Sequence, residues 1–71
     1  MATIVRAHIA GTVWKIEVEV GAQVSEGQTV VILESMKMEM PVESPSDGKV
    51  ARILCTPGQA VEEGAKLLEL E

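Results

Sequence analysis

The sequence has almost no aromatic side chains: it contains one tryptophan, Trp14, and neither phenylalanine nor tyrosine. It has one cysteine, Cys55, which excludes an internal disulfide bond, whereas a small secreted domain would normally need several. The longest purely apolar run, Val30 to Leu33, is far too short to cross a bilayer. The N-terminal residues also lack the charged and then apolar layout of a secretory signal. We therefore expect a cytoplasmic protein with no membrane association.

Basic residues are scarce as well. Six Lys and Arg stand against eleven Asp and Glu, which gives a formal net charge of −5. Nucleic-acid binding depends on clustered basic side chains, so this balance argues against it and favours partners with basic docking surfaces. The 71 residues allow one domain, 1–71, without a cleft between domains for substrate. These features favour a carrier or binding module, monomeric in isolation, over a complete enzyme.

The chain consists of two copies of one pattern. A shift of 37 residues places Gly11, Gly21 and Gly27 on Gly48, Gly58 and Gly64, so all six glycines pair without a gap. The same shift matches Val13, Ile16, Val24, Glu26, Leu33 and Glu34 with Val50, Ile53, Val61, Glu63, Leu70 and Glu71. Such agreement indicates duplication, and it predicts a pseudo-two-fold axis.

Each copy has short runs rich in Val and Ile, separated by glycine-bearing turns, which is typical of β-strands. We expect an all-β fold, a flattened barrel or sandwich of two four-stranded halves that bury their apolar faces against each other. The expected strands are Thr3–His8, Thr12–Val18, Thr29–Ser35, Met38–Glu43, Lys49–Leu54 and Lys66–Leu70, with short pieces at Gln23–Val24 and Ala60–Val61. The expected core is Val5, Val13, Ile16, Val24, Val31, Leu33, Val50, Ile53, Val61, Leu68 and Leu70.

Lys37 lies between the two copies, where two expected strands meet. A two-residue loop of Met36 and Lys37 would pair Ser35 with Met38, Leu33 with Met40 and Val31 with Val42, which brings apolar side chains together on one face. Two features are unfavourable for stability. Tight hairpins prefer Asn-Gly or similar pairs at the bend, and Glu34 would face Glu39 across the strands. Local rules that fail without an evident compensation often mark a functional site.

The segment Glu34-Ser35-Met36-Lys37-Met38-Glu39 resembles the attachment motif of biotin carboxyl carrier proteins, whose usual form is Glu-Ala-Met-Lys-Met-Glu. The surrounding glycines follow the biotinyl/lipoyl domain pattern, so the resemblance covers essentially the whole chain. Ser35 replaces the usual alanine, and His8 stands where many relatives have proline. The segment between Val18 and Gly21 is too short for the protruding loop of some bacterial acetyl-CoA carboxylase carriers.

The resemblance implies a biotinyl/lipoyl-like hammerhead fold and a non-catalytic carrier function. A biotin protein ligase would attach biotin to the Lys37 amine, and it would read Glu34, Met36, Met38 and Glu39. The arm would then shuttle carboxybiotin between a biotin carboxylase and a carboxyltransferase. The acceptor substrate is set by the carboxyltransferase, so this chain does not name it.

Two other functions remain open. A lipoyl carrier, with lipoate on the lysine, shares the fold, but its motif usually contains Asp-Lys-Ala. An unmodified lipoyl-like structural adaptor would generally lack the lysine motif. No metal site is expected, because His8 has no Cys or carboxylate cluster at ligand spacing. Trp14 matches Ala51 in the second copy, which predicts a partly exposed strand position, and Cys55 matches Val18 and is expected to act as a small hydrophobe.

Overall fold

The computed structural model describes residues 2–71, and every regular element in that range is a β-strand. The strands alternate Val, Ile, Leu and Thr with polar residues, which suits a sheet that is buried on one face. Their bounds are β1 Thr3–Arg6, β2 Gly11–Ile16, β3 Gln23–Val24, β4 Thr29–Ser35, β5 Met38–Glu43, β6 Gly48–Ile53, β7 Ala60–Val61 and β8 Lys66–Leu70. Five of the eight expected ranges match fully. The first strand ends two residues early, and the strands at β2 and β6 begin one residue and end one or two residues before their expected bounds.

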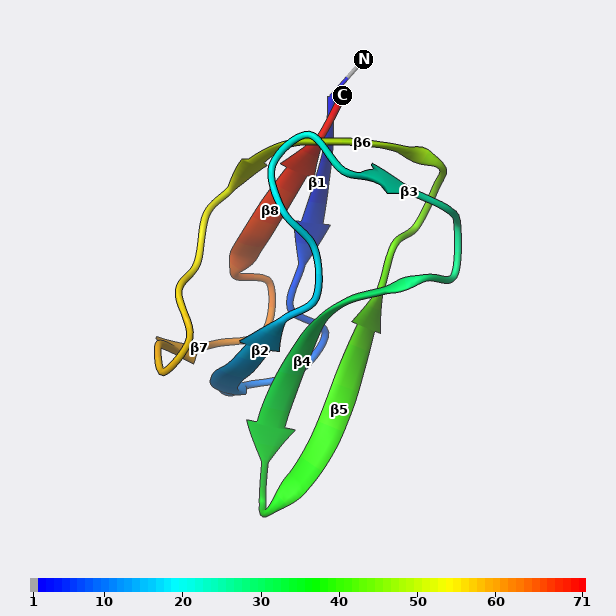
Figure 1. Ribbon diagram of the computed structural model, residues 1–71. Helices are drawn as coiled ribbons and strands as arrows, with labels where there is room; N and C mark the ends of the chain where they lie inside the picture. The colour runs from blue at the N-terminus through cyan, green and yellow to red at the C-terminus, as the bar shows by residue number, and fades with distance from the viewer. Residues whose placement is uncertain (1) are drawn as a thin grey trace.

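The strands form two four-stranded antiparallel sheets, with the orders β1-β8-β6-β3 and β5-β4-β2-β7. The two layers enclose the core and curl around it, which confirms the expected sandwich (Figure 1). Each sheet takes two strands from each copy of the repeat, so the copies interleave and neither forms a layer of its own. Across residues 2–71 there is no helix with the length and apolarity needed to traverse a bilayer.

Backbone hydrogen bonds repeat at the spacing of the sequence duplication. The Ala7 N–H donates to the Ala65 carbonyl, and the equivalent Ser44 N–H donates to the Gln28 carbonyl, both at 2.8 Å. Strand β1 pairs with β8 so that Thr3 lies opposite Leu70. The start of β1 and the C-terminus therefore lie together, at the end opposite the β4–β5 hairpin, as the duplication predicts (Figure 1).

Nine of the eleven expected core residues are buried. The other two, Ile16 and Ile53, are partly buried and pack against the core. Cys55 is buried among apolar side chains, although it and Val18 lie just beyond the strands and not within them. Trp14 is 49% exposed, as expected for a partly exposed strand position. The core also contains six residues that the strand alternation did not predict, Ala7, Val18, Val30, Val42, Cys55 and Leu67.

Two of those additional core residues are fully buried because of β-bulges. Val30 is the extra residue at a register shift between Thr29 and Val31, and Leu67 is its equivalent in β8, between Lys66 and Leu68. A bulge places two residues of one strand opposite one residue of its partner, so neighbouring side chains can both turn inward. Both residues have no exposed surface, and the same irregularity therefore adds one large side chain to the core in each copy.

Candidate functional site

The β4–β5 hairpin projects beyond the body of the molecule and ends at Lys37 (Figure 1). Its register pairs Ser35 with Met38, Leu33 with Met40 and Val31 with Val42, as the sequence predicts. Leu33, Val31 and Val42 are buried, and their side chains anchor the hairpin to the core. Because these pairs fix the register, the two-residue loop of Met36 and Lys37 is fixed as well.

Both loop residues have positive φ, 53° at Met36 and 65° at Lys37, which is the conformation of a type I′ turn. This left-handed region favours glycine, and a residue with a Cβ pays about 1–2 kcal/mol to enter it. No other non-glycine residue in the described range has a positive φ. The strain of the chain is thus concentrated at the hairpin tip, where such outliers typically accompany function.

The side chains at the tip are exposed. Met36 is 92% exposed and Met38 is 63% exposed, unlike the buried methionines expected of a structural role. Lys37 is also exposed, and neither of the ion pairs found in residues 2–71, Lys15–Glu17 and Arg52–Glu69, includes it. Its primary amine can therefore be approached by a large partner without breaking a contact of the fold.

Glu34 and Glu39 lie directly opposite each other on the two strands of the hairpin, and both are exposed. Like charges in this position destabilise the pair by a fraction of a kcal/mol, about 0.2–1 kcal/mol at most. The structure thus brings together all five residues that the sequence singled out, with the lysine at the apex and a methionine and a glutamate on each side of it.

Gly11 packs against β4 close to the hairpin tip, a contact that the sequence interpretation missed. A Cβ at Gly11 would lie 2.6 Å from the backbone carbonyl oxygen of Glu34, so only glycine lets β2 approach β4 this closely. The equivalent Gly48 approaches the Glu71 carbonyl, where the distance would be 3.3 Å. The paired glycines in the sequence were the available signal, but they were interpreted only as turn residues.

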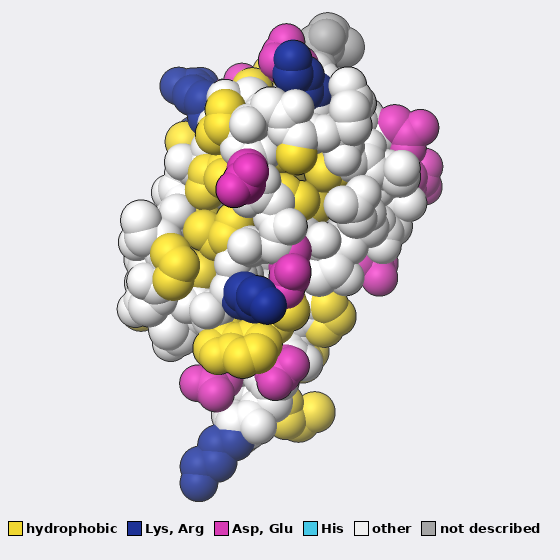
Figure 2. Space-filling model, viewed as in Figure 1, with side chains coloured by type: hydrophobic (Ala, Val, Ile, Leu, Met, Phe, Trp, Pro, Cys, Tyr) yellow, Lys and Arg dark blue, Asp and Glu magenta, His cyan; other side chains and the backbone are white. Residues whose placement is uncertain are grey.

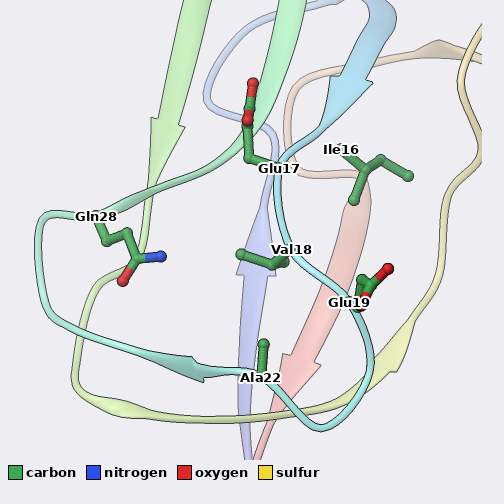
Figure 3. Close-up of a pocket in the computed structure, with 6 residues that line it drawn as sticks. All are labelled: Ile16, Glu17, Val18, Glu19, Ala22 and Gln28. Carbon is green, nitrogen blue, oxygen red and sulfur yellow. The ribbon is translucent and has the colours of Figure 1, made fainter.

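A surface hollow lies elsewhere on the molecule, away from the hairpin tip. It lies between the end of β2 and the loops on either side of β3, and Figure 3 shows Gln28 turned toward it. Its lining is Ile16, Glu17, Val18, Glu19, Ala22 and Gln28, so its ionisable side chains are two carboxylates, of which Glu17 forms an ion pair with Lys15. Within residues 2–71, no group of three or more His, Cys, Asp or Glu side chains could hold a metal ion, and His8 is exposed.

Comparison with known proteins identifies this arrangement. A family model described as "Biotin-requiring enzyme" matches residues 1–70. The chain belongs to this biotin/lipoyl attachment family. A Biotin/lipoyl attachment protein of Bacillus subtilis is 46% identical over 66 residues, which covers 93% of this chain and 90% of that protein. The biotin carboxyl carrier protein of acetyl-CoA carboxylase from Solanum lycopersicum is 42% identical over 65 residues, or 92% of this chain and 93% of that protein.

Solved structures of the family share the fold. The crystal structure of Kluyveromyces lactis urea carboxylase matches all of this chain with a TM-score of 0.94 and 35% identity, over 6% of that protein. A single-chain long-chain acyl-CoA carboxylase matches 96% of this chain with a TM-score of 0.90 and 38% identity, over 7% of that protein. The chain is therefore similar in length to two small relatives and to one small part of these large carboxylases.

Proposed function

We propose that this protein is a biotin carrier whose Lys37 amine forms an amide with biotin. One observation carries the proposal: a family member of this kind presents an exposed lysine, flanked by exposed methionines, at the strained tip of its hairpin. A fold that needed only a turn would place glycine or asparagine there. A lysine that must enter a partner's active site requires this exposure.

The attachment reaction would be carried out by a biotin protein ligase. The neutral Lys37 Nζ attacks the carbonyl carbon of a biotinyl adenylate, the bond from that carbon to the phosphate oxygen breaks, and AMP leaves. The nitrogen loses a proton as the amide forms. Glu34, Met36, Met38 and Glu39 surround the amine and are the side chains that a ligase meets first. They support recognition of the tip and contribute little to packing.

The domain itself would position the attached biotin and carry it between the active sites of partner enzymes. Bound biotin supplies a ring nitrogen that accepts and releases a carboxyl group in the active sites of partner enzymes. The chain contributes a rigid hairpin, anchored by Leu33 and Val31, and a long flexible arm at its end. Tethering of this kind gives effective concentrations of about mM for each partner site. We infer that the partners are the biotin carboxylase and carboxyltransferase components of a carboxylase.

The relatives favour biotin over lipoate. Those named above include a biotin carboxyl carrier protein and two carboxylases, while lipoate occurs only in the combined name of the Bacillus subtilis protein. The methionines on both sides of Lys37 agree with this preference. No observation favours an unmodified adaptor.

Co-expression of the full chain with a biotin protein ligase tests the proposal. We expect a streptavidin signal from the native sequence and none from Lys37→Ala. Lys49→Ala is the matched control, because Lys49 is also exposed but lies in β6, and it should retain the full signal. Persistence of the signal in Lys37→Ala, or its absence from the folded native chain, would show that the assignment is wrong.

A further inference from the structure

Trp14, the single aromatic residue of the chain, is the extra residue of a β-bulge in β2. Val13 lies opposite Leu33 and Lys15 lies opposite Ile32, so Trp14 has no partner of its own in β4. Val13 is buried, whereas Trp14 is 49% exposed. The bulge therefore directs a large aromatic ring outward, on the sheet that also carries the hairpin, and bulges often re-aim side chains near functional sites.

The fold itself does not require an aromatic ring at this bulge. The equivalent position in the second copy is Ala51, which is likewise the extra residue of a bulge, between Val50 and Arg52 in β6. The two bulges are related by the pseudo-two-fold axis, but only the one at the lysine end of the molecule has an indole. The difference between Trp14 and Ala51 thus follows the position of Lys37 and not the needs of the backbone.

Trp14 belongs to a small apolar surface with two further members. Ile32 alternates with buried Val31 and Leu33 and lies opposite both Lys15 and Pro41, so these residues face outward, and Trp14 directly precedes Lys15 at the bulge. We call Trp14, Ile32 and Pro41 the Trp14 patch. Glu34 and Glu39 form the next outward pair toward the tip. Figure 2 shows hydrophobic and acidic side chains gathered just above the basic side chain at the lower tip.

We propose that the Trp14 patch is a resting site for the ring of biotin carried on Lys37. The inference rests on the proposed function and adds a binding site to it. Lys37 lies four residues beyond Leu33, which is a distance of about 13 Å along the strand, and β2 is about 5 Å to the side. A biotinylated lysine has eleven bonds from Cα to the ring, so it extends about 14 Å. The attached ring therefore reaches the indole.

The patch suits the chemistry of the uncharged ring. The bicyclic ring has apolar faces and a thioether, and a thioether sulfur makes favourable contacts with an aromatic ring. Because the ligand is tethered at an effective concentration of about mM, even a millimolar affinity would hold it for about half of the time. The carboxylates of Glu34 and Glu39 would repel a ring that bears a carboxylate, and the neighbouring Lys15 ammonium is paired with Glu17 at 3.7 Å, so the surface favours the uncharged ring.

The fluorescence of Trp14 tests this directly, because the chain has no other tryptophan and no tyrosine. The full chain is prepared with and without a biotin protein ligase, and intact mass establishes which sample bears biotin. We expect the biotinylated chain to emit at shorter wavelength and acrylamide to quench it about twofold more slowly, as half-occupancy requires. Lys37→Arg, taken through the same co-expression, should match the unmodified chain.

Capture by avidin gives a second readout that does not use Trp14 fluorescence. Biotinylated Trp14→Ala should bind avidin about twofold faster than the native chain, because its ring is no longer held, and Trp14→Phe should restore the slower rate. Should Trp14→Ala fail to fold, the fluorescence comparison decides alone. Unchanged emission and quenching on a chain whose mass shows biotin would overturn the resting site and leave the carrier function intact. Absence of the biotin mass would instead refute the proposed function.

Discussion

The strained turn at Lys37 predicts that the native residue lowers stability. Lys37 has a φ of 65°, and replacing it with glycine removes a conformational cost of about 1–2 kcal/mol. Glycine also raises the conformational entropy of the unfolded chain, which lowers the free energy of unfolding by about 0.4–1 kcal/mol. The unmodified Lys37→Gly variant should therefore be more stable than Lys37→Ala by about 0.5–1 kcal/mol, or roughly 2–8 °C in Tm for a chain of this length.

The comparison with alanine isolates the backbone effect, because both variants lose the same charge and side chain. Thermal and urea unfolding of the two unmodified variants would measure the difference. Glu63 offers a matched control: it is exposed, lies in a loop and has no positive φ, so Glu63→Gly should be less stable than Glu63→Ala. If glycine at position 37 is no more stable than alanine, the turn is not strained and the functional interpretation of its geometry loses its basis.

Three further changes have definite expected outcomes. Exchanging the flanks as Met36→Asp with Met38→Ala should slow biotinylation and allow some lipoylation, while Tm barely moves because both methionines are exposed; early unfolding with an unchanged biotinylation rate would contradict this. Gly11→Ala should destabilise the chain more than Gly48→Ala, since its Cβ meets a carbonyl oxygen at 2.6 Å instead of 3.3 Å, and urea unfolding of both would check the order. Burial raises the pKa of the Cys55 thiol above its ordinary value. The neutral thiol therefore contributes its full stability below the ordinary pKa, and this contribution is lost as the pH rises through the raised pKa of the folded state. Unfolding measured at alkaline pH should show the loss in the native chain and not in Cys55→Val.

The sequence was sufficient to predict the hairpin and its register, because a shift by one residue would have turned Leu33 and Val31 out of the core. The duplication likewise predicted a pseudo-two-fold axis, and the pairing of β1 with β8 at the end opposite Lys37 agrees with that axis. These features depend on patterns that can be counted along the chain. They are sufficient to place the candidate site at the hairpin tip.

The bulges could not be predicted in the same way. Strict alternation assigns one of Val30 and Val31 to the surface, yet both are fully buried because the extra residue breaks the alternation. The interleaving of the two copies was also hidden, since a repeat of 37 residues does not specify which strands are neighbours. Both depend on packing between distant strands, as does the close approach of Gly11 to the backbone of Glu34.

The most direct test of the carrier function is the mass of the protein purified from the cells that make it, followed by mapping of its peptides. A biotin carrier should show a single biotin-sized increment, located on the peptide that contains Lys37 and absent from those with Lys15, Lys49 or Lys66. A lipoyl-sized increment, an increment on another lysine, or an unmodified chain from cells that biotinylate their other carriers would contradict it.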